Sequence, residues 1–514
     1  MKAAAVPPVG KQNKNVAAGS KDDDDDDVTA KKDDKTTKKD KKNKKTKGTT
    51  TSSKQASTAT KKKNQPVTAK SHPRYVRRIG GHSGSINSIC ISPSHKNTTT
   101  NNNGDWIATS GTDGILRVTN ISSGGGGGGG NSGEALLSLS CVVQSDKTLG
   151  NFKDQLTCLN WSSEDDRTVV GIMKNAKCIA FYRMRKKKTQ QQMDDNTKKS
   201  STKNPFELIE LIKRRIPLEQ VLGDDTITSC LIDQTHSKYC LLITGSDSKH
   251  NNVITWNGND GTVVGGSAAT HTSTIVDGND NKLRLSLNGQ FICTRVEGES
   301  SQVKIYELHK SKVKGEVEPI FDKIPAKGVM TITPPKSSNA GKIADVAFLC
   351  IMGSGNTYDV LSTTSTLAVL GSVNGIIQIW NLNVEYQNQQ DPILLVSYRS
   401  KEVFGDTSSD SSKQITLIEA TTTTASSNTG STSRIAVATN DGALHLFTYK
   451  GDSKKNGGEI VYDFTIDDPH PEDQIGGGIG DMQFCCCSSS NTSATNTIYT
   501  RGKRSKDVHC WNIS

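Results

Sequence analysis

The sequence predicts an all-β fold, a seven-bladed β-propeller, and three observations predict it. A characteristic strand ending recurs seven times along the 514 residues. Tight-turn dipeptides separate the strands inside the first, fifth and sixth copies. A short strand precedes the first copy without belonging to it, while the last copy lacks an outer strand. Supersecondary units that repeat in this way stack against their neighbours, and four-strand units favour a ring of β-sheets.

The strand endings share one position, at which six of the seven copies carry an aromatic residue. They are Thr119-Asn120, Tyr182-Arg183, Trp256-Asn257, Tyr306-Glu307, Trp380-Asn381, Phe447-Thr448 and Trp511-Asn512. The copies lie about 65 residues apart, whereas a common propeller repeat has roughly 40–45 residues. The excess falls in stretches rich in Ser, Thr, Asn and Gly, which are typical of surface loops.

Each copy alternates hydrophobic and polar residues with the period of two that β-strands show. In the first copy, Gly81-His82 precedes the strands "SINSICISP" and "WIATSG", a turn at Asp113-Gly114 and the strand "ILRVTNI". Asn374-Gly375 and Asp441-Gly442 mark the same turn in the fifth and sixth copies, and such dipeptides suit tight hairpins. The predicted blade cores are 81–121, 154–184, 226–258, 279–309, 341–382, 413–449 and 480–513.

Fourth, outer strands are expected after six of the copies. Their sequences are "EALLSLSCVV", "FELIELI", "GTVVGG", "VEPIFDKI", "ILLVSYR" and "EIVYDFTI". The seventh copy has none, whereas Arg74 to Ile79 ("RYVRRI") is a strand that belongs to no copy. We therefore expect Arg74 to Ile79 to pair as the outer strand of the last blade. This pairing would close the ring and remove two exposed sheet edges.

The positive charge of the chain is concentrated at its beginning. The net charge is +11, and residues 1–70 supply +10 of it through 19 Lys and 9 Asp. The predicted organisation is a basic Lys/Asp-rich leader, 1–71, followed by a nearly neutral propeller, 72–514. The leader is expected to be disordered because it has no aromatic residues and almost no branched apolar residues to bury. Attraction to phosphate or to an anionic surface is expected from the leader.

The remaining composition argues against a secreted, membrane or metal-binding protein. The 12 cysteines include no Cys-x-x-Cys pair and lie in apparent strands, which is typical of reduced thiols in the cytosol or nucleus. No stretch approaches 18 apolar residues, so no transmembrane segment is expected. The glycine run Gly124 to Gly130 lacks the Lys-Ser/Thr of a phosphate-binding loop. "DDPHPED" (Asp467 to Asp473) has residues that chelate cations, although a solvated loop between blades is the favoured interpretation.

Several of these segments resemble known repeats. The Gly-His openings and the Trp-Asn endings resemble the WD-repeat family, with Asn in place of Asp. "WNLNVEYQNQQDPILL" (Trp380 to Leu395) resembles the transducin beta-like 2 family more closely. "IAFYRMRKKK", "LITGSDSKHNNVITWN" and "RLSLNGQFICTRVEGESSQVKIYEL" support that resemblance. It implies a non-enzymatic scaffold of the endoplasmic reticulum and its unfolded-protein response, which binds a stress kinase and messenger RNA. Members can carry an N-terminal membrane anchor where this chain has its hydrophilic leader.

The WD-repeat resemblance also implies a buried hydrogen-bonded set of His, Ser or Thr, Asp and Trp in a blade. The first copy keeps His82, Ser110 and Asp113 but has Thr119 at the Trp position. We therefore expect an incomplete set that stiffens the blade and has no catalytic role. No pattern elsewhere indicates catalysis, so the prediction is a protein that is not an enzyme, with no catalytic residue, metal or cofactor.

Two segments are candidate interaction sites. The loop 384–392 joins the third and fourth strands of the fifth blade, and it is either a hairpin loop fixed by a proline or a docking edge. Its candidate residues are Val384, Glu385, Tyr386, Asp391 and Pro392. The lysine clusters of the leader are open to three interpretations: a nuclear import signal, an RNA or ribosome contact, or solubilising charge. Their candidate residues are Lys38, Lys39, Lys41, Lys42, Lys44 and Lys45.

Two further surfaces are expected to be solvent-facing. "RMRKKK" (Arg183 to Lys188) is expected on a loop. The rim opposite the 384–392 loop is expected to display His82, Asp113, Asp247, Lys249, Asn374, Asp441, Arg501 and Arg504. Loops on such rims commonly bind peptides.

The function predicted from these features is a monomeric scaffold or adaptor for protein partners. The expected location is the cytoplasm, with the endoplasmic reticulum surface implied by the resemblance and the nucleus as the alternative. The alternative function is an RNA- or ribosome-associated protein that binds through the basic leader.

Overall fold

The computed structural model describes the chain from His72 to Ile513 with gaps. The described ranges are 72–92, 106–121, 137–145, 152–161, 167–187, 206–217, 226–232, 239–245, 251–257, 263–268, 284–285, 291–295, 303–307, 310–311, 320–321, 330–351, 365–382, 392–405, 413–423, 432–452, 457–471, 478–485 and 497–513. All of them belong to the unit Asn64–Ser514; the second unit, Met1–Lys63, lies outside the described residues. The expected disorder of the leader and the domain boundary at residue 71 therefore stay predictions.

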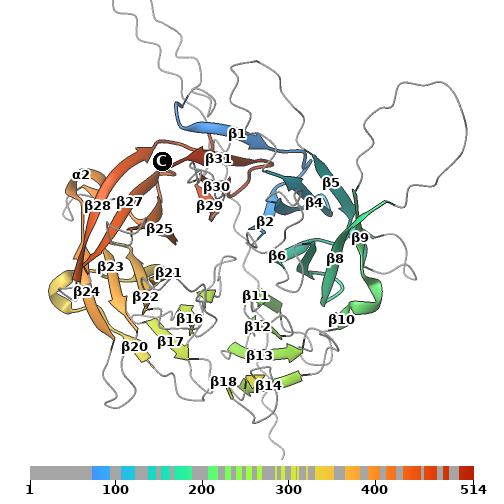
Figure 1. Ribbon diagram of the computed structural model, residues 1–514, viewed down its shortest axis with the longest axis horizontal. Coiled ribbons are helices and arrows are strands. Elements are labelled where there is room, and N and C mark those ends of the chain that lie inside the picture. Colours follow the sequence, from blue (N-terminus) through green and yellow to red (C-terminus); the bar gives the residue numbers. More distant parts are fainter. Residues whose placement is uncertain are drawn as a thin grey trace, which may run out of the picture. The chain divides into compact units, whose positions relative to one another are not determined.

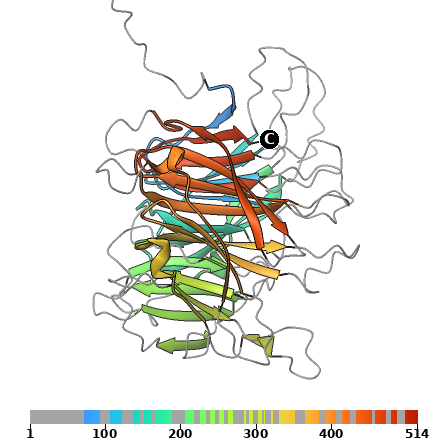
Figure 2. The same cartoon turned by 90° about the vertical axis from the view of Figure 1, so that its left-hand side faces the viewer.

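The described elements are nearly all β-strands, and every described strand pair is antiparallel (Figure 2). Helical turns are short: η2 (Ile212–Arg214), η3 (Lys336–Ser338) and α2 (Lys401–Phe404). The described strands form seven sheets of four or five strands and one two-stranded sheet. The all-β propeller fold is confirmed, whereas the number of seven blades stays a prediction.

The first half of the chain supplies three of these sheets. The first contains β2 (Ile86–Ile91), β3 (Trp106–Gly111), β4 (Ile115–Asn120) and β5 (Ser138–Val142). The second contains β6 (Leu156–Trp161), β7 (Thr168–Met173), β8 (Cys178–Lys186), β9 (Phe206–Glu210) and β10 (Ile216–Pro217). The third contains β11 (Thr226–Ile232), β12 (Tyr239–Gly245), β13 (Asn251–Asn257) and β14 (Val263–Ala268).

The second half supplies the others. The fourth sheet contains β15 (Arg284–Leu285), β16 (Phe291–Arg295), β17 (Val303–Glu307) and β20 (Met330–Ile332). The fifth contains β21 (Ile343–Ile351), β22 (Ser365–Ser372), β23 (Ile377–Asn381) and β24 (Ile393–Tyr398). The sixth contains β25 (Ile415–Thr423), β26 (Thr432–Thr439), β27 (Leu444–Asp452) and β28 (Gly457–Ile466). The last contains β29 (Ile479–Cys485), β30 (Thr497–Gly502), β31 (Val508–Asn512) and β1 (Tyr75–Ile79).

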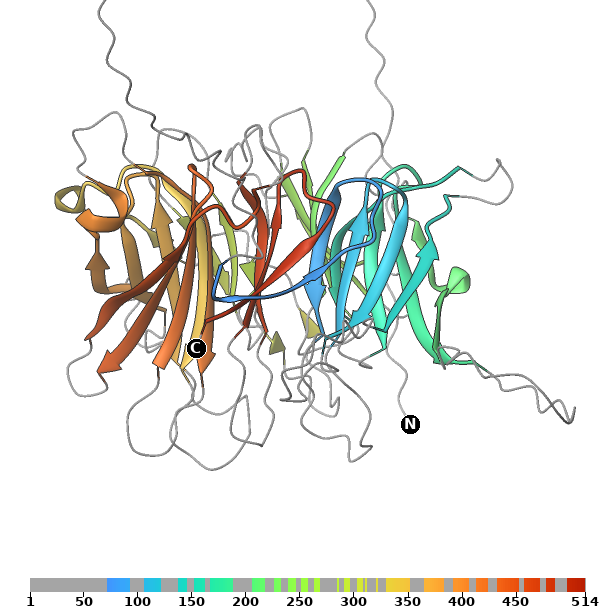
Figure 3. The same cartoon turned by 90° about the horizontal axis from the view of Figure 1, so that it is seen from above.

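The predicted closing pair is confirmed. β1 runs antiparallel to β31, with Tyr75 opposite Trp511 and Ile79 opposite Val508 (Figures 1 and 3). The order β1-β31-β30-β29 makes the amino-side strand the outer member of the sheet formed by the carboxyl end. The edge of β31 is therefore covered by this chain itself and is not open to another strand.

Five of the six expected outer strands are confirmed as β5, β9, β14, β24 and β28. The remaining one, "VEPIFDKI" after the fourth copy, was wrongly predicted as an outer strand. Within it, β19 (Ile320–Phe321) pairs with β18 (Lys310–Ser311) in the separate two-stranded sheet, and β20 takes the fourth position beside β17. Pro319 lacks the backbone N–H that a strand in a sheet donates, which disfavours a long strand there.

The innermost strand of several sheets carries a register irregularity close to its start. It lies at Ile86/Ser88 in β2, Ile343/Asp345 in β21, Ile415/Leu417 in β25 and Ile479/Asp481 in β29. A bulge of this kind re-aims the side chains next to it. Ser88 Oγ accepts a hydrogen bond from Leu159 N at 3.1 Å, and Asp345 Oδ2 accepts one from Ile418 N at 2.9 Å. The re-aimed side chains thus bind the backbone of the neighbouring sheet.

The hydrophobic core is distributed between facing sheets. One cluster joins the first and second sheets and includes Trp106, Leu116, Trp161 and Tyr182. Another joins the fifth and sixth sheets, where Phe404 of α2 stacks on Phe447 with ring centroids 6.3 Å apart. Each sheet is therefore buried on the faces that its neighbours cover, which leaves turns and sheet ends for other roles.

Candidate functional site

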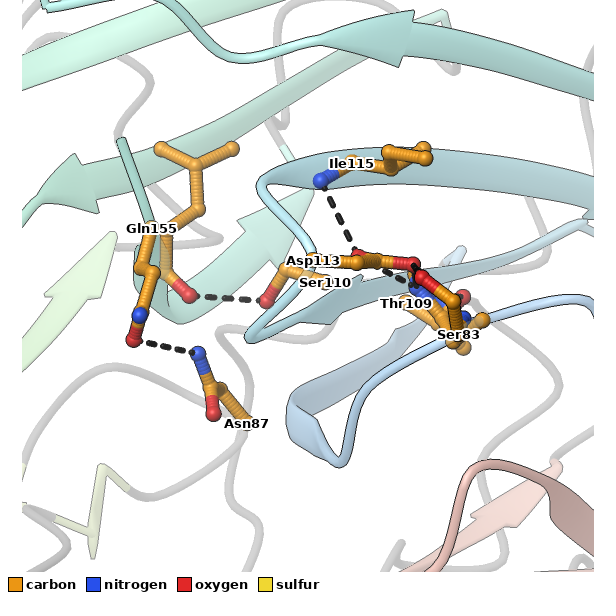
Figure 4. A network of polar contacts seen from close by, with 9 residues as sticks. Ser83, Asn87, Thr109, Ser110, Asp113, Ile115 and Gln155 are labelled. Atoms are coloured by element: carbon orange, nitrogen blue, oxygen red, sulfur yellow. Dashed lines mark hydrogen bonds and ion pairs between the residues drawn. The ribbon is translucent and has the colours of Figure 1, made fainter. Parts of the chain in front are cut away.

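A polar network built around a histidine lies where β3 turns into β4. His82 Nδ1 is 3.0 Å from Asp113 Oδ1, and His82 Nε2 is 2.9 Å from Thr109 Oγ1. Asp113 also accepts hydrogen bonds from Ser83 N at 2.9 Å and Ile115 N at 3.2 Å (Figure 4). The Gly-His opening and the Asp-Gly turn are therefore tied to each other through one carboxylate.

The order Asp, His and hydroxyl is that of a hydrolytic triad, but this network is enclosed. His82 is 6% exposed and Thr109 is 3% exposed, so a substrate does not reach the hydroxyl. Burial lowers the pKa of His82, although the hydrogen bond that His82 donates to Asp113 acts in the opposite direction. Burial alone would raise the pKa of Asp113, but the hydrogen bonds from His82 and Ser83 N bring it below its usual value. The network is a structural element of the blade.

Thr109 occupies the role that the sequence assigned to Ser110, and that assignment is wrong. Ser110 Oγ donates to Leu156 O at 2.9 Å and so links the first sheet to the second. Neighbouring residues of a strand point to opposite faces, so an error of one position exchanges the two roles. Thr119, at the position where many repeats carry Trp, lies 3.1 Å from Ser138 Oγ through its hydroxyl.

The sixth sheet has a second network, which sequence reasoning missed. His445 Nε2 is 3.2 Å from Thr439 Oγ1, and His445 Nδ1 is 2.7 Å from Thr465 Oγ1. Thr439 donates to Asp441 Oδ1 at 2.5 Å, and Asp441 pairs with Lys413 at 2.9 Å. Burial, followed by the charge of Lys413, lowers the pKa of His445 to about 4. The signal for it was a single His in the hydrophobic strand "ALHLF".

The last sheet has a third network, which contains the Trp that the first sheet lacks. His470 Nε2 is 2.9 Å from Thr500 Oγ1, and Trp511 Nε1 donates to that oxygen at 2.9 Å. The His470 ring stacks on His509 with centroids 4.5 Å apart, while His509 Nδ1 donates to Pro469 O at 2.7 Å. His470 Nδ1 is buried without a hydrogen-bond partner among the described atoms. Burial, together with the neighbouring His509 and Arg501, lowers the pKa of His470.

This network changes the interpretation of the acidic loop "DDPHPED". Asp467 and Asp468 are exposed, whereas Pro469 and His470 are buried, so a fully solvated loop is wrong for its middle. In the described part of the chain, no group of three or more His, Cys, Asp or Glu side chains is placed to hold a metal ion.

The predicted rim is only partly a surface. His82 and Arg501 are buried, and the Asp113 side chain is 5% exposed, so these three support the sheets. The exposed members are Asn374, Asp441 and Arg504. Asn374 Nδ2 donates to Asn339 O at 2.7 Å, and Asp441 belongs to the network of His445 through Thr439. Asp247 and Lys249 lie outside the described residues.

Most of the candidate interaction residues also lie outside the described residues. These are Val384, Glu385, Tyr386 and Asp391 of the docking loop, and all the leader lysines from Lys38 to Lys45. They stay predictions. Pro392 is described, and it is buried directly before β24, where it limits the conformations with which the loop enters the strand.

The basic stretch "RMRKKK" is mostly in a strand, so its expected place on a loop is wrong. β8 continues through Lys186, and the alternation of exposed Arg183, buried Met184 and exposed Arg185 has the period of a strand. Arg185 lies opposite Glu207 of β9 and forms an ion pair with it at 2.5 Å. The strand continues through these basic residues because the Arg183 and Arg185 side chains lie on its exposed face.

Solved structures similar to this chain include Sqt1 from Chaetomium thermophilum, at 14% identity over 84% of this chain and 82% of that chain, with a TM-score of 0.43. The U3-55K structure is 12% identical over 85% of this chain and 98% of that chain, with a TM-score of 0.44. The Cps50 (Swd1) β-propeller domain of Myceliophteria thermophila is 10% identical over 86% of this chain and 99% of that chain, with a TM-score of 0.44. These structures are WD40 β-propellers.

No family model matches the chain, and no curated protein matches it. Among the described residues, no helix has the length and apolar character needed to cross a membrane.

Proposed function

We propose that the chain is a non-enzymatic scaffold that binds protein partners through the loops and sheet edges of its propeller. The observation that supports this function is the enclosure of its histidine networks. His82, His445 and His470 are the described side chains that look most like catalytic groups, and all three are buried and hydrogen-bonded within their own sheets. A rigid β frame of this kind leaves recognition to its surface, where loops and exposed strands differ most between proteins.

Within this function, we propose an adaptor similar to the transducin beta-like 2 family. The support is the segment Trp380 to Leu395, whose Val-Glu-Tyr and Gln-Asp-Pro groups resemble that family. The partner proposed on this basis is a stress kinase, and the proposed place is the endoplasmic reticulum surface in the unfolded-protein response. Glu385 and Tyr386 are the proposed docking residues of the loop.

A second candidate function is an RNA- or ribosome-associated protein. The observation in its favour is the +10 charge of residues 1–70, which contain 19 lysines. Lysine clusters neutralise phosphates without reading sequence, and their binding weakens steeply as salt rises.

One experiment separates these functions. The tagged full chain, a variant without residues 1–70 and the double variant Glu385→Ala/Tyr386→Ala are purified from cells, and the proteins and RNA that elute with each are identified. The scaffold function predicts protein partners that survive the deletion, and the loop proposal predicts a loss of at least one partner from the double variant. Partners that consist of RNA alone, lost with residues 1–70, would instead establish the second function. A full chain that retains no partner contradicts both.

A further inference from the structure

Exposed hydrophobic side chains gather at one part of the described surface. Five large hydrophobic residues are exposed among the described residues, and three of them lie around the junction of the first and second sheets. They are Val142 at 44%, Phe152 at 68% and Ile212 at 49%. Single exposed hydrophobic residues are ordinary, but a group of them on a folded protein indicates a binding surface.

Hydrogen bonds hold the segments of this group together. Ser145 N donates to Phe152 O at 3.3 Å, and Gln144 forms an isolated antiparallel bridge with Lys153. The guanidinium of Arg215 donates to Ser145 O at 2.7 Å and to Gln144 O at 2.8 Å. Because Arg215 directly follows η2, these bonds hold Ile212 near the segment that continues β5 beyond Val142.

The same junction is rich in lysine and arginine. Asp154 accepts hydrogen bonds from Asn175 N at 2.9 Å and Ala176 N at 2.8 Å, which places the turn between β7 and β8 beside Lys153. The basic residues on these segments are Lys153, Lys174, Lys177, Lys213, Arg214 and Arg215.

The acidic residues on these segments are withdrawn from solvent. Asp154 is 0% exposed and Glu210 pairs with Arg215 at 2.6 Å, with 11% of the Glu210 side chain exposed. Among the described residues of these segments, the exposed charges are therefore positive, and Glu207, the partly exposed carboxylate of β9, is paired with Arg185. This local positive charge is unusual for the chain, because residues 71–514 together carry a net charge of only +1.

We infer that this junction, which we call the basic–apolar surface (Val142, Phe152, Lys153, Lys174, Ile212 and Lys213), binds an acidic segment of a partner protein that carries hydrophobic side chains. The inference rests on the proposed scaffold function and specifies the chemistry of its partner. Phe152 and Ile212 supply hydrophobic anchors, and the lysines attract carboxylates and accelerate encounter. Nucleic acid fits less well, because Phe152 is the one aromatic ring among the six residues of this surface, whereas bound strands stack successive bases on several rings.

The hydrophobic part is tested with a fluorescein-labelled 15-residue peptide of Glu and Asp that contains two Leu and one Phe. Its affinity for the full-length protein is measured by fluorescence anisotropy. The double variant Phe152→Ser/Ile212→Ser is expected to bind about tenfold more weakly, as loss of hydrophobic anchors usually does. Ile393→Ser is the matched control, because Ile393 is also exposed, at 50%, but lies on β24 of the fifth sheet. Equal affinity of the double variant and the control overturns the inference.

The charge part is tested by reversal. Lys153→Glu/Lys213→Glu is expected to weaken binding of the acidic peptide by about tenfold and to strengthen binding of a peptide with Lys at every acidic position. Both substitutions lie on exposed residues, so the thermal unfolding midpoint should not change. A 15-nucleotide single-stranded RNA is titrated in parallel. The inference is overturned if the reversal and the Phe152 variant weaken RNA binding while the peptide binds equally to all proteins.

Co-purification with the same variants separates this inference from the scaffold function. If the wild type retains protein partners and the double variant Phe152→Ser/Ile212→Ser loses at least one, both stand. If the double variant retains every partner, the basic–apolar surface is not a docking site, while the scaffold function stands. If the wild type retains no partner, the scaffold function fails, and with it the docking role of this surface.

Discussion

The ring of Tyr75 meets the ring of Trp511 edge-on, with centroids 5.6 Å apart, where β1 joins β31. The flanking residues extend this contact to both neighbouring sheets. The guanidinium of Arg74 lies 3.5 Å above the Phe464 ring of β28, and Arg77 donates to Ile121 O at the end of β4. β1 and the residue before it, Arg74, therefore join the last sheet to the sheets on either side of it.

Tyr75→Ala is expected to destabilise the protein by about 2–3 kcal/mol, because it removes a large side chain from a partly buried aromatic cluster. The free energy of unfolding is measured by urea denaturation. Val76→Ala is the control: Val76 is the next residue of β1 but is 47% exposed, so its change should stay within about 0.5 kcal/mol. Similar effects of the two substitutions would show that the aromatic contact does not stabilise the closure.

Gln483→Ala is expected to cost about 1–3 kcal/mol, because it leaves backbone groups unpaired in another sheet. Gln483 Nε2 donates to Ile89 O at 3.0 Å, and its Oε1 accepts from Ile91 N at 3.1 Å. Hydrogen exchange of the Ile91 amide and urea denaturation measure the effect. Gln155→Ala is the comparison, since Gln155 Oε1 makes a long contact of 3.4 Å with the Asn87 side chain. If Gln483 and Gln155 prove equally dispensable, side-chain bonds between inner strands do not matter for stability.

Thr109→Val is expected to destabilise the first sheet by about 1–3 kcal/mol. Val has nearly the shape of Thr but leaves His82 Nε2 buried without its hydroxyl partner. Thr112→Val, at an exposed position of the following turn, should change stability by no more than about 0.5 kcal/mol. Binding of protein partners by Thr109→Val should be unchanged at temperatures where the variant is folded. A loss of binding without loss of stability would assign His82 a role beyond structure.

Stability is expected to fall in mild acid. The pKa values of His82, His445 and His470 are lower in the folded chain than the value of about 6.5 in the unfolded chain. Below pH 6.5 the unfolded chain therefore takes up protons that the folded chain does not. The contribution of these histidines to the free energy of unfolding is fully present above that pH and decreases below it. For His445, with a folded pKa of about 4, the loss at pH 5 is about 2 kcal/mol.

Urea denaturation at pH 7.5 and pH 5 measures this loss. In His445→Gln the difference between the two pH values should shrink by about 2 kcal/mol, whatever the variant's stability at pH 7.5. The charged groups that act on His445 are Lys413, Asp441 and Asp467, so their own titration stays in both proteins and cancels in the comparison. An unchanged pH difference in the variant contradicts the prediction.

The closure and most outer strands could be predicted from the sequence because they rest on pattern and counting. The seventh copy has no fourth strand of its own, and Arg74 to Ile79 is a strand that belongs to no copy. Pairing the two is the simplest solution, and β1 does pair with β31. The failure at "VEPIFDKI" has a local cause. The prediction followed the hydrophobic residues of this segment and gave too little weight to Pro319. The strand that does pair with β17 is Met330–Ile332, whose three residues are too few to form a recognisable pattern in the sequence.

The candidate sites were harder to predict, because exposure depends on contacts that a sequence does not contain. The burial of His82 and Arg501 removes them from the predicted rim, and the exchange of Ser110 for Thr109 follows from a single-residue step along a strand. Phe152 is another case. A lone Phe beside a strand is usually buried, but Phe152 is 68% exposed, in a segment whose backbone is hydrogen-bonded to Ser145 N through Phe152 O.

The pairing of β1 with β31 also sets an order of events during synthesis. Residue 75 leaves the ribosome more than four hundred residues before residue 511, its neighbour across the pair. Intermediate sheets can form from local hairpins as they emerge, but the last sheet cannot be completed until β31 (Val508–Asn512) has been synthesised. Until then β1 is an unsatisfied strand, and the cell's chaperones have most reason to act on this protein during that interval.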